Sequence, residues 1–542
     1  MVSKLNIFKS FVQHVVHQLQ AFAVAQCEKS REIHNTSLSY LNANERAILM
    51  QMKENMSREN ILRRGRLTAM DELAQRFTSS ILTDEWLFKY DIMVDFVHVA
   101  MLKRQGIIPN DAAKAILNGL HTIQTKGYDS LNKDAEDVHI AIESALIDLI
   151  GEEYGGMLHV GRSRNDEVAT CIRMAVREQL VQLMIKIVHL KETLLDKASE
   201  NTETLIPGFT HLQRAQPTTL AHHLIAHYDA LGRDFTRLHN CFSRTNACPL
   251  GAAAFASTGF PLDRDFAAIM LGFEGIVENS MDAVSARDYA IECLAVLSNL
   301  MINISCLAEE FILWSTSEFG YVEISDAYTS TSSIMPQKKN PDTLELVRAK
   351  TGSVVGALTS VLAICKALPY SYNLDLQEVT IHLKTATKNT IDSIAITTGV
   401  LTSIKFNLDR LKVESSVTFI TATELADTIV RKAKIPFRTA HAIVGELAQN
   451  DNVDLKTLDG VSKERIGKTL SSLGLTQEDV TSALDPYTSV KRRNVKGGPS
   501  PEEVSRMINS RRAEVNKENN EVRELFEWLN KVDAHVKNLA ED

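Results

Sequence analysis

Long stretches of the chain repeat apolar residues at spacings of three and four, which is the period of an α-helix. The first stretch runs from Ile172 to Leu194, and the second runs from Ile291 to Trp314. They lie in segments of 45 and 44 residues that contain neither glycine nor proline, the residues that most often interrupt regular structure. Apolar residues of the second stretch fall on more than one face, as in a helix buried inside a bundle. We therefore predict an all-α fold with long helices over 170–200 and 289–314 at its centre.

Composition narrows the class of protein. The chain has 542 residues, of which 44% are hydrophobic and 23% are charged, an ordinary balance for a soluble globular protein. The net charge of -9 argues against nucleic-acid binding. Seven cysteines at irregular spacings, with no CxxC pair, predict free thiols in a reducing compartment and hence a cytoplasmic protein. The chain has no run of 18 apolar residues, so we expect no membrane span.

The helical pattern and its interruptions suggest four regions. We expect an N-terminal extension over 1–60, a helical domain over 61–160, the central bundle over 161–413 and a C-terminal helical domain over 414–542. The extension is amphipathic and poor in acids, as transit peptides are, but it has no arginine before Arg31. An additional helix or an upstream extension is therefore the favoured interpretation, and the role of this segment stays open.

Two polar clusters flank the first long helix. The cluster at its start contains Arg162, Arg164, Asn165 and Asp166. Arginine can bind a carboxylate through two parallel hydrogen bonds, and a helix N-terminus also favours anions, so this cluster suits an anionic substrate. A capping sequence with surface arginines would look the same.

The cluster after the helix fills 207–217, between two prolines, and it contains His211. Histidine is the usual general acid or base near neutral pH, although a polar loop between helices is the simpler interpretation. On the next predicted helix, His223 and His227 are spaced i, i+4, but no acidic residue stands between them as HExxH requires. The sequence therefore gives little support for a metal at this pair.

Two further polar segments follow the second long helix. Residues 329–341 combine a Ser/Thr run with Lys338 and Lys339, and we expect a loop that ends where Asn340 caps a helix beginning at Pro341. Such an electropositive loop could bind a carboxylate or activate a serine, whereas a solvated linker is the alternative. Residues 369–378 open another helix and are, taken alone, a weak signal.

These segments together resemble the argininosuccinase/fumarase superfamily. The superfamily signature corresponds to Thr331-Ser-Ser-Ile-Met-Pro-Gln-Lys-Lys-Asn340. A narrower resemblance, to the argininosuccinate lyase family, rests on Gly161-Arg-Ser-Arg-Asn-Asp-Glu-Val-Ala-Thr170, Thr210-His-Leu-Gln-Arg-Ala-Gln-Pro217 and Pro336-Gln-Lys-Lys-Asn-Pro-Asp342. It extends in order from about Arg63 to the C-terminal region and leaves residues 1–60 outside.

The resemblance implies a homotetramer with a 20-helix core, in which each active site is shared between three subunits. It implies β-elimination of a small-molecule substrate, argininosuccinate, to arginine and fumarate, with no metal or organic cofactor. By the same resemblance Ser332 is the base, His211 is the acid, Glu345 orients His211, and Lys338 supports the serine. The implied substrate contacts are Ser80, His139, Arg164, Asn165, Thr210, Gln213, Arg287, Ser333, Asn340, Tyr372 and Gln377.

The sequence departs from the family pattern at several positions. Thr331 replaces the glycine that precedes the two serines, while Leu374 and Thr380 replace common lysines. These changes bear on loop mobility and on substrate recognition. Two alternatives therefore stay open, namely another fumarate-releasing lyase and a non-catalytic structural protein like the lens crystallins of this family.

Overall fold

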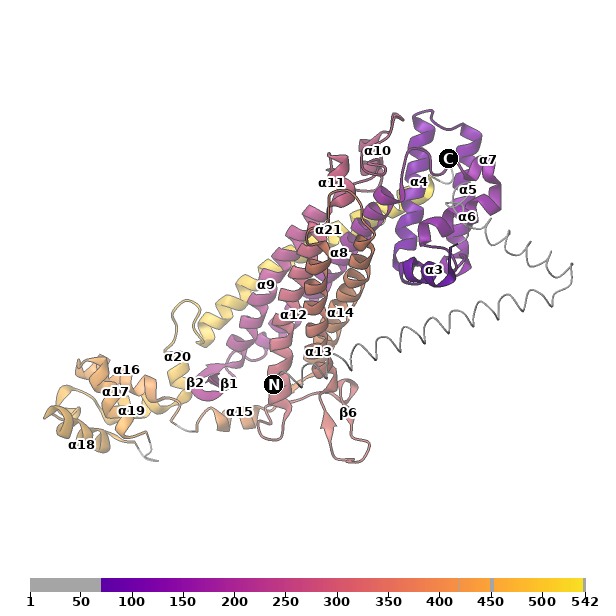
Figure 1. Cartoon of the computed structure of the whole chain (residues 1–542). Helices are drawn as coiled ribbons and strands as arrows, with labels where there is room; N and C mark the ends of the chain where they lie inside the picture. The colour runs from indigo at the N-terminus through magenta and orange to yellow at the C-terminus, as the bar shows by residue number, and fades with distance from the viewer. Residues whose placement is uncertain (1–69, 418, 449–452, 540–542) are drawn as a thin grey trace, which may run out of the picture. The chain divides into compact units, whose positions relative to one another are not determined.

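A computed structural model describes residues 70–417, 419–448 and 453–539. Its described residues form two compact units, one of 70–82 with 132–145 and one of 83–131 with 146–539. Helices dominate both units, and strands are few and short, so the predicted all-α fold is confirmed (Figure 1). The predicted extension over 1–60 lies outside the described residues.

The smaller unit consists of the short helix α3 and of residues 132–145, a turn segment followed by the first part of α6 (Val138–Ile150). Helix α3 (Glu72–Thr78) begins where the Asp71 carboxylate accepts the amide hydrogens of Leu73 and Ala74. The chain after this helix is held by Ser79 Oγ, which donates to the Ala135 carbonyl, and by the Ser80 amide, which donates to the Glu136 carbonyl. These bonds place Ser80 beside the segment that leads to His139.

Five long helices pack against one another and form the bundle of the larger unit. Helix α8 begins with a capping box, in which Ser163 Oγ accepts an amide hydrogen and the Asp166 side chain accepts the Ser163 amide. Most of its apolar residues are fully buried, which explains the helical period of the sequence. The five helices are α8 (Arg164–Ser199), α9 (Leu220–Thr245), α12 (Asp288–Ser315), α13 (Asp342–Cys365) and α14 (Asp375–Ser403).

The C-terminal helix α21 (Pro501–Asn538) runs along α8 and also contacts α4 (Phe88–Arg104) and α9. Lys191 of α8 and Glu518 of α21 form a buried ion pair with a separation of 2.5 Å. Helices α12 and α13 are long and apolar enough to cross a membrane by length and composition alone. In the larger unit these two helices pack against each other, and α14 contacts both of them.

A separate apolar core holds the helices before α21. Its buried side chains include Leu425, Ile429, Ile443, Leu458 and Val480. The helices concerned are α16 (Ala422–Ala433), α17 (Phe437–Glu446), α18 (Leu455–Ile466) and α19 (Gln477–Leu484). The predicted domain boundaries at 61–160, 161–413 and 414–542 stay a prediction.

The described residues contain further helices, 3-10 turns and short strands. The further helices are α5 (Asn110–Lys126), α6 (Val138–Ile150), α7 (Glu152–Gly155), α10 (Arg264–Met270), α11 (Ser280–Ser285), α15 (Leu408–Glu414) and α20 (Pro486–Lys491). The 3-10 turns are Ile81–Leu87, Tyr128–Ser130, Asp326–Tyr328 and Ser471–Leu473. The paired strands are β1 (Leu205–Thr210) with β2 (Gln213–Thr219), β3 (Ala247–Cys248) with β4 (Gly275–Ile276), β5 (Val322–Glu323) with β8 (Lys405–Phe406), and β6 (Ser330–Thr331) with β7 (Lys339–Asn340). The six cysteines of the described residues are free thiols, as predicted.

Two segments that the sequence suggested as loops contain antiparallel strand pairs. Residues 207–217 belong to the β1–β2 hairpin, and residues 330–340 close through β6 and β7. The prediction that Asn340 caps the next helix is wrong by one residue, because Asn340 ends β7 and Pro341 takes the capping position. The Ser330–Asn340 pairing uses Asn340 in the strand ladder, so the helix starts later.

Candidate active site

The β1–β2 hairpin presents His211 at its tip. Thr210 pairs with Gln213, so His211 and Leu212 form a two-residue turn, and their φ angles are 56° and 58°. Two successive left-handed residues are the geometry of a type I′ turn, whose twist matches that of the flanking strands. Thr210, His211 and Gln213 are all exposed. The hairpin therefore directs this proposed acid and two proposed substrate contacts away from its own chain.

The hairpin is fixed to neighbouring elements close to its tip. Arg214 of β2 forms an ion pair with Glu414 of α15. The rings of Phe209 and Phe319 lie 5.9 Å apart, and Phe319 in turn packs edge-on against Tyr321. These contacts hold the hairpin against α15 and against the segment that follows α12.

The loop between β6 and β7 places two amide donors on Ser332. Its Oγ accepts the N–H of Ile334 at 3.3 Å and the N–H of Met335 at 3.1 Å. Hydrogen bonds of this kind stabilise negative charge on the oxygen, which a serine needs if it is to act as a base. The same contacts also occur in ordinary serine turns, so the chemistry depends on what else surrounds the oxygen.

Other proposed residues of this loop point outward or support it. Ser333, Lys338 and Glu345 are exposed, and Asn340 is half-buried in β7. Lys339 holds the base of the loop through Asp326 at 2.7 Å and Glu323 at 3.5 Å. Thr331, which replaces the family glycine, pairs with Lys339 in the strand ladder.

The start of α8 carries Arg164 and Asn165, both half-buried. The Asn165 side-chain amide donates to the Ala254 carbonyl at 3.0 Å. Asp166 is fully buried and accepts the amide hydrogens of Ser163, Gly251 and Ala253 at 2.8–2.9 Å. Burial raises the pKa of Asp166 to about 6, although these three amide donors oppose the rise.

Arg162 belongs to the protein interior, which corrects the expectation that it helps to bind an anionic substrate. Its Nη2 lies 2.5 Å from Asp95 and 3.0 Å from Glu167, and all three side chains are almost completely buried. The two carboxylates already pair with the guanidinium. Asp166 is likewise occupied with backbone amides. Arg164 and Asn165 stay proposed substrate contacts at this helix start because of the family resemblance.

The starts of α12 and α14 carry the other proposed contacts of the larger unit. Arg287, just before α12, is buried and donates to the carbonyls of Val284 and Ala286. Tyr372 precedes α14, and Gln377 lies in its first turn, both half-buried. Thr380 is buried in α14, whereas Leu374 is exposed at its start.

Within one chain these residues lie at opposite ends of the bundle. The 36 residues of α8 span about 54 Å and separate Arg164 from the hairpin that follows the helix. The starts of α8, α12 and α14 share one end, while the β1–β2 hairpin, the β6–β7 loop and the start of α13 share the other (Figure 1). No hydrogen bond or ion pair within residues 70–417 joins His211 to Ser332 or Glu345. One chain therefore does not bring the proposed residues together.

Sequence reasoning missed how the tips of these segments are built. His211-Leu212 is not one of the residue pairs that usually form two-residue hairpin turns, such as Asn-Gly. The sequence therefore did not predict a hairpin at this position. The amide donors on Ser332 come from Ile334 and Met335, whose side chains have no relation to that role. One sequence signal could have suggested the turn at Ser332. Serine side chains often accept the amide hydrogens of the residues two and three positions later in the chain.

Comparison of the sequence with known proteins identifies the family to which this chain is related. A family described as lyase matches residues 65–356, and one described as argininosuccinate lyase C-terminal matches residues 419–491. The argininosuccinate lyase of Methanosarcina mazei is 52% identical over 89% of this chain and 99% of its own length. That of Methanosarcina acetivorans is 55% identical over 84% of this chain and 93% of its own.

Solved structures agree with the sequence relatives. A structure of EDDS lyase in complex with formate is 30% identical, with a TM-score of 0.78, and the match covers 87% of this chain and 94% of that one. An EDDS lyase variant with bound fumarate gives a TM-score of 0.77 at 29% identity, with the same coverage. The matches to both family descriptions, and relatives that align over nearly their full length, lead to one conclusion: this chain belongs to the argininosuccinate lyase family of the lyase superfamily.

Proposed function

We propose that this chain cleaves argininosuccinate into arginine and fumarate by reversible β-elimination, and that it serves arginine biosynthesis in the cytoplasm. The observation that carries the proposal is the pair of amide donors on Ser332 Oγ, in a loop that also holds Lys338. A serine hydroxyl is a poor base in water, and these donors favour its deprotonated form. The family membership supports the choice of substrate.

In this mechanism Ser332 removes a proton from the carbon next to a substrate carboxylate. The electron pair of the broken C–H bond is held by the carboxylate as a dianion, which cations and amide donors stabilise. The pair then forms the double bond of fumarate as the C–N bond breaks, and His211 gives a proton to the departing guanidinium nitrogen. Glu345 orients His211, and Lys338 supports the charge near Ser332.

The proposed substrate contacts of the larger unit come from both ends of the bundle. At one end these are Thr210, Gln213, Ser333 and Asn340, and at the other they are Arg164, Asn165, Arg287, Tyr372 and Gln377. The family resemblance adds Ser80 and His139. Since about 54 Å of α8 separates the two ends, a complete site needs segments from more than one chain.

A homotetramer with sites shared between three subunits meets this need. Exposed apolar side chains support it, because Leu346, Val355 and Leu362 of α13 are 37–60% exposed in one chain. Light scattering should give about four times the chain mass of 60.3 kDa. A stable and active monomer would contradict both the assembly and the shared site.

One assay tests the activity. Purified protein should release fumarate, detected by its absorbance, when argininosuccinate is added, whereas adenylosuccinate and aspartate should give none. EDDS is a useful third control, because EDDS lyase is a structural neighbour and because Leu374 and Thr380 replace family lysines here. Turnover of a control in preference to argininosuccinate would favour another fumarate-releasing lyase. No turnover of any of them would favour a structural protein.

A further inference from the structure

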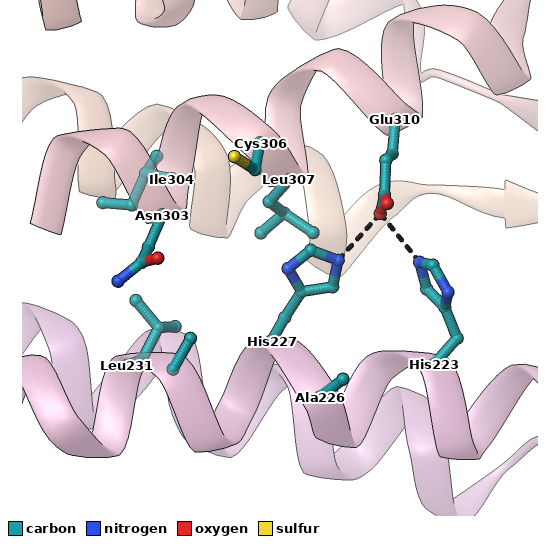
Figure 2. Close-up of a pocket in the computed structure, with 10 residues that line it drawn as sticks. His223, Ala226, His227, Leu231, Asn303, Ile304, Cys306, Leu307 and Glu310 are labelled. Atoms are coloured by element: carbon teal, nitrogen blue, oxygen red, sulfur yellow. Dashed lines mark hydrogen bonds and ion pairs between the residues drawn. The ribbon is translucent and has the colours of Figure 1, made fainter. Parts of the chain in front are cut away.

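A cluster of two histidines and a glutamate joins helices α9 and α12, outside the residues proposed for catalysis. His223 and His227 lie one helical turn apart on α9, and Glu310 faces them from α12 (Figure 2). The Nε2 atoms of both imidazoles lie 2.8 Å from the same carboxylate oxygen, Oε2 of Glu310. The three side chains thus converge on one point from two helices.

The ligand atoms of the cluster are already close enough to share an ion. One ring nitrogen of each histidine and one oxygen of Glu310 all lie within 4.8 Å of one another. Zinc binds imidazole nitrogen and carboxylate oxygen at about 2.0–2.2 Å, so neighbouring ligand atoms of a tetrahedral site are about 3.3 Å apart. Moving the Glu310 carboxylate outward by about 0.5 Å would open the present 2.8 Å contacts to that spacing.

The surroundings favour a fixed site with one open position. The ring of His223 packs 4.9 Å from Trp314 and 5.3 Å from His227, which restricts both imidazoles. Beside the cluster is a pocket of about 270 Å³, with mainly apolar walls, into which a fourth ligand such as water could project (Figure 2). The lining residues of the pocket outside the cluster include Leu231, Asn303, Ile304, Cys306 and Leu307.

We propose that His223, His227 and Glu310 bind a zinc ion that ties α9 to α12. Two histidines and a glutamate, with water as the fourth ligand, form an established tetrahedral zinc set. Without the ion, the three proposed ligand atoms bond to one another, because the Nε2 atoms of both imidazoles hydrogen-bond to Glu310 Oε2.

A second acidic cluster of the larger unit, Asp91, Asp95 and Glu167, offers a useful contrast. There the Arg162 guanidinium already occupies the centre, 2.5 Å from Asp95 and 3.0 Å from Glu167. A second cation would have to displace a buried arginine. The histidine cluster has no such competitor among the residues that line its pocket.

The test is a zinc titration of the full-length protein after chelator treatment and dialysis. Wild type should bind one Zn²⁺ per chain at micromolar concentration, with a higher melting temperature when loaded. Co²⁺ in its place should give the visible absorption of a tetrahedral site. His223→Ala and His227→Ala should each weaken binding by at least about a hundredfold, because loss of a supporting contact alone costs 10–100-fold.

Two further variants separate a metal site from a simple hydrogen-bonded cluster. Glu310→Gln keeps an oxygen that accepts from the imidazoles but removes the charge, so it should fold normally and lose zinc. His239→Ala, on the same helix and also half-exposed, is the matched control and should bind as wild type does. The proposal is overturned if wild type binds no zinc, or if the His223→Ala/His227→Ala double variant binds the same amount with the same cobalt spectrum.

Discussion

His211 and Leu212 occupy the two central positions of a type I′ turn, with φ angles of 56° and 58°. A left-handed backbone costs an ordinary L-residue about 1–2 kcal/mol, and asparagine and glycine tolerate it best. Leu212 is also 80% exposed, so burial does not offset that cost within one chain. The hairpin keeps a strained tip whose exposed histidine is directed away from its own chain, as a site shared between chains requires.

Leu212→Gly should stabilise the protein by about 0.5–1 kcal/mol. The substitution relieves about 1–2 kcal/mol of left-handed strain, and it costs about 0.5–1 kcal/mol of additional backbone entropy in the unfolded chain. Thermal unfolding at fixed protein concentration measures the change. Leu73→Gly is the control, because Leu73 is 77% exposed on α3, where glycine should only destabilise. A lower melting temperature for Leu212→Gly would mean that Leu212 is buried by another chain.

His211→Asn tests the proposed acid without disturbing the turn, since asparagine accepts left-handed backbone. It should slow fumarate release by about 10²–10⁴-fold and recover part of this loss with a substrate whose leaving group needs little protonation. Folding and assembly should match wild type by circular dichroism and light scattering. An equal loss with both kinds of substrate would remove His211 as the acid.

Ser332→Ala should abolish turnover while argininosuccinate still binds, because the proposed carboxylate contacts remain. Glu345→Gln should give a milder form of the His211 defect, and the losses should not add in a double variant, because the residues serve one chemical event. Binding by calorimetry and turnover by fumarate absorbance must be measured separately. Near-normal turnover of Ser332→Ala in a correctly assembled protein would exclude Ser332 as the base.

Mixed assemblies test whether the two ends of the bundle serve different sites. Asn165→Ala and Ser332→Ala should each be inactive alone, but they should recover activity when denatured together and refolded. If each site takes these residues from different chains, random mixing leaves about a quarter of the sites with both residues intact. If one chain supplies both Ser332 and His211 to the same site, a mixture of Ser332→Ala and His211→Asn chains should recover no activity. No recovery in any mixture would contradict a shared site.

Gly399 of α14 supports the base of the β6–β7 loop by lacking a side chain. A Cβ at this position would overlap the phenol of Tyr328, whose carbonyl accepts a hydrogen bond from Thr343 at the start of α13. Gly399→Ala should therefore displace Tyr328, lower the melting temperature and reduce turnover. Gly460→Ala in α18 is the control, since nothing lies within 4 Å of its Cβ, and it should stabilise by about 0.5–1 kcal/mol. Unchanged activity of Gly399→Ala would show that the loop tolerates the shift.

The sequence predicted the long helices well, because their apolar period is local information. The stretches from Ile172 to Leu194 and from Ile291 to Trp314 both lie within observed helices, α8 and α12. Composition also singled out the polar segments at 162–166, 207–217 and 329–341, whose role in a site stays a prediction. It did not foresee that Arg162 pairs with Asp95, since that contact joins elements far apart in the chain.

The same limit explains the histidine cluster. His223 and His227 were visible as an i, i+4 pair, but their partner Glu310 comes from another helix more than 80 residues later. No local sequence pattern predicts this contact, because it depends on how α9 packs against α12. The separation of the proposed site over two bundle ends is likewise a consequence of helix length and direction, which only the folded chain displays.

Asp166, at the start of α8, should make the stability of the folded protein depend measurably on pH. Its pKa is raised to about 6 in the folded protein by burial, so the folded state binds a proton more readily than the unfolded state. Because the pKa is raised on folding, Asp166 stabilises the folded protein at pH values below the ordinary aspartate pKa near 4. This stabilisation is lost as the pH rises through the folded-state pKa of about 6. Asp166→Asn cannot titrate, and its amide turns a donor toward one of the three backbone N–H groups, which costs about 1–3 kcal/mol.

The stability advantage of wild type over Asp166→Asn should therefore be largest at and below about pH 4, should fall between about pH 4 and pH 6, and should level off above pH 6. Melting temperatures of both proteins, measured in parallel across this range, isolate the group, because all other titrations cancel in the difference. An advantage that grows with pH would mean that the Ser163, Gly251 and Ala253 amides outweigh burial and hold Asp166 ionised.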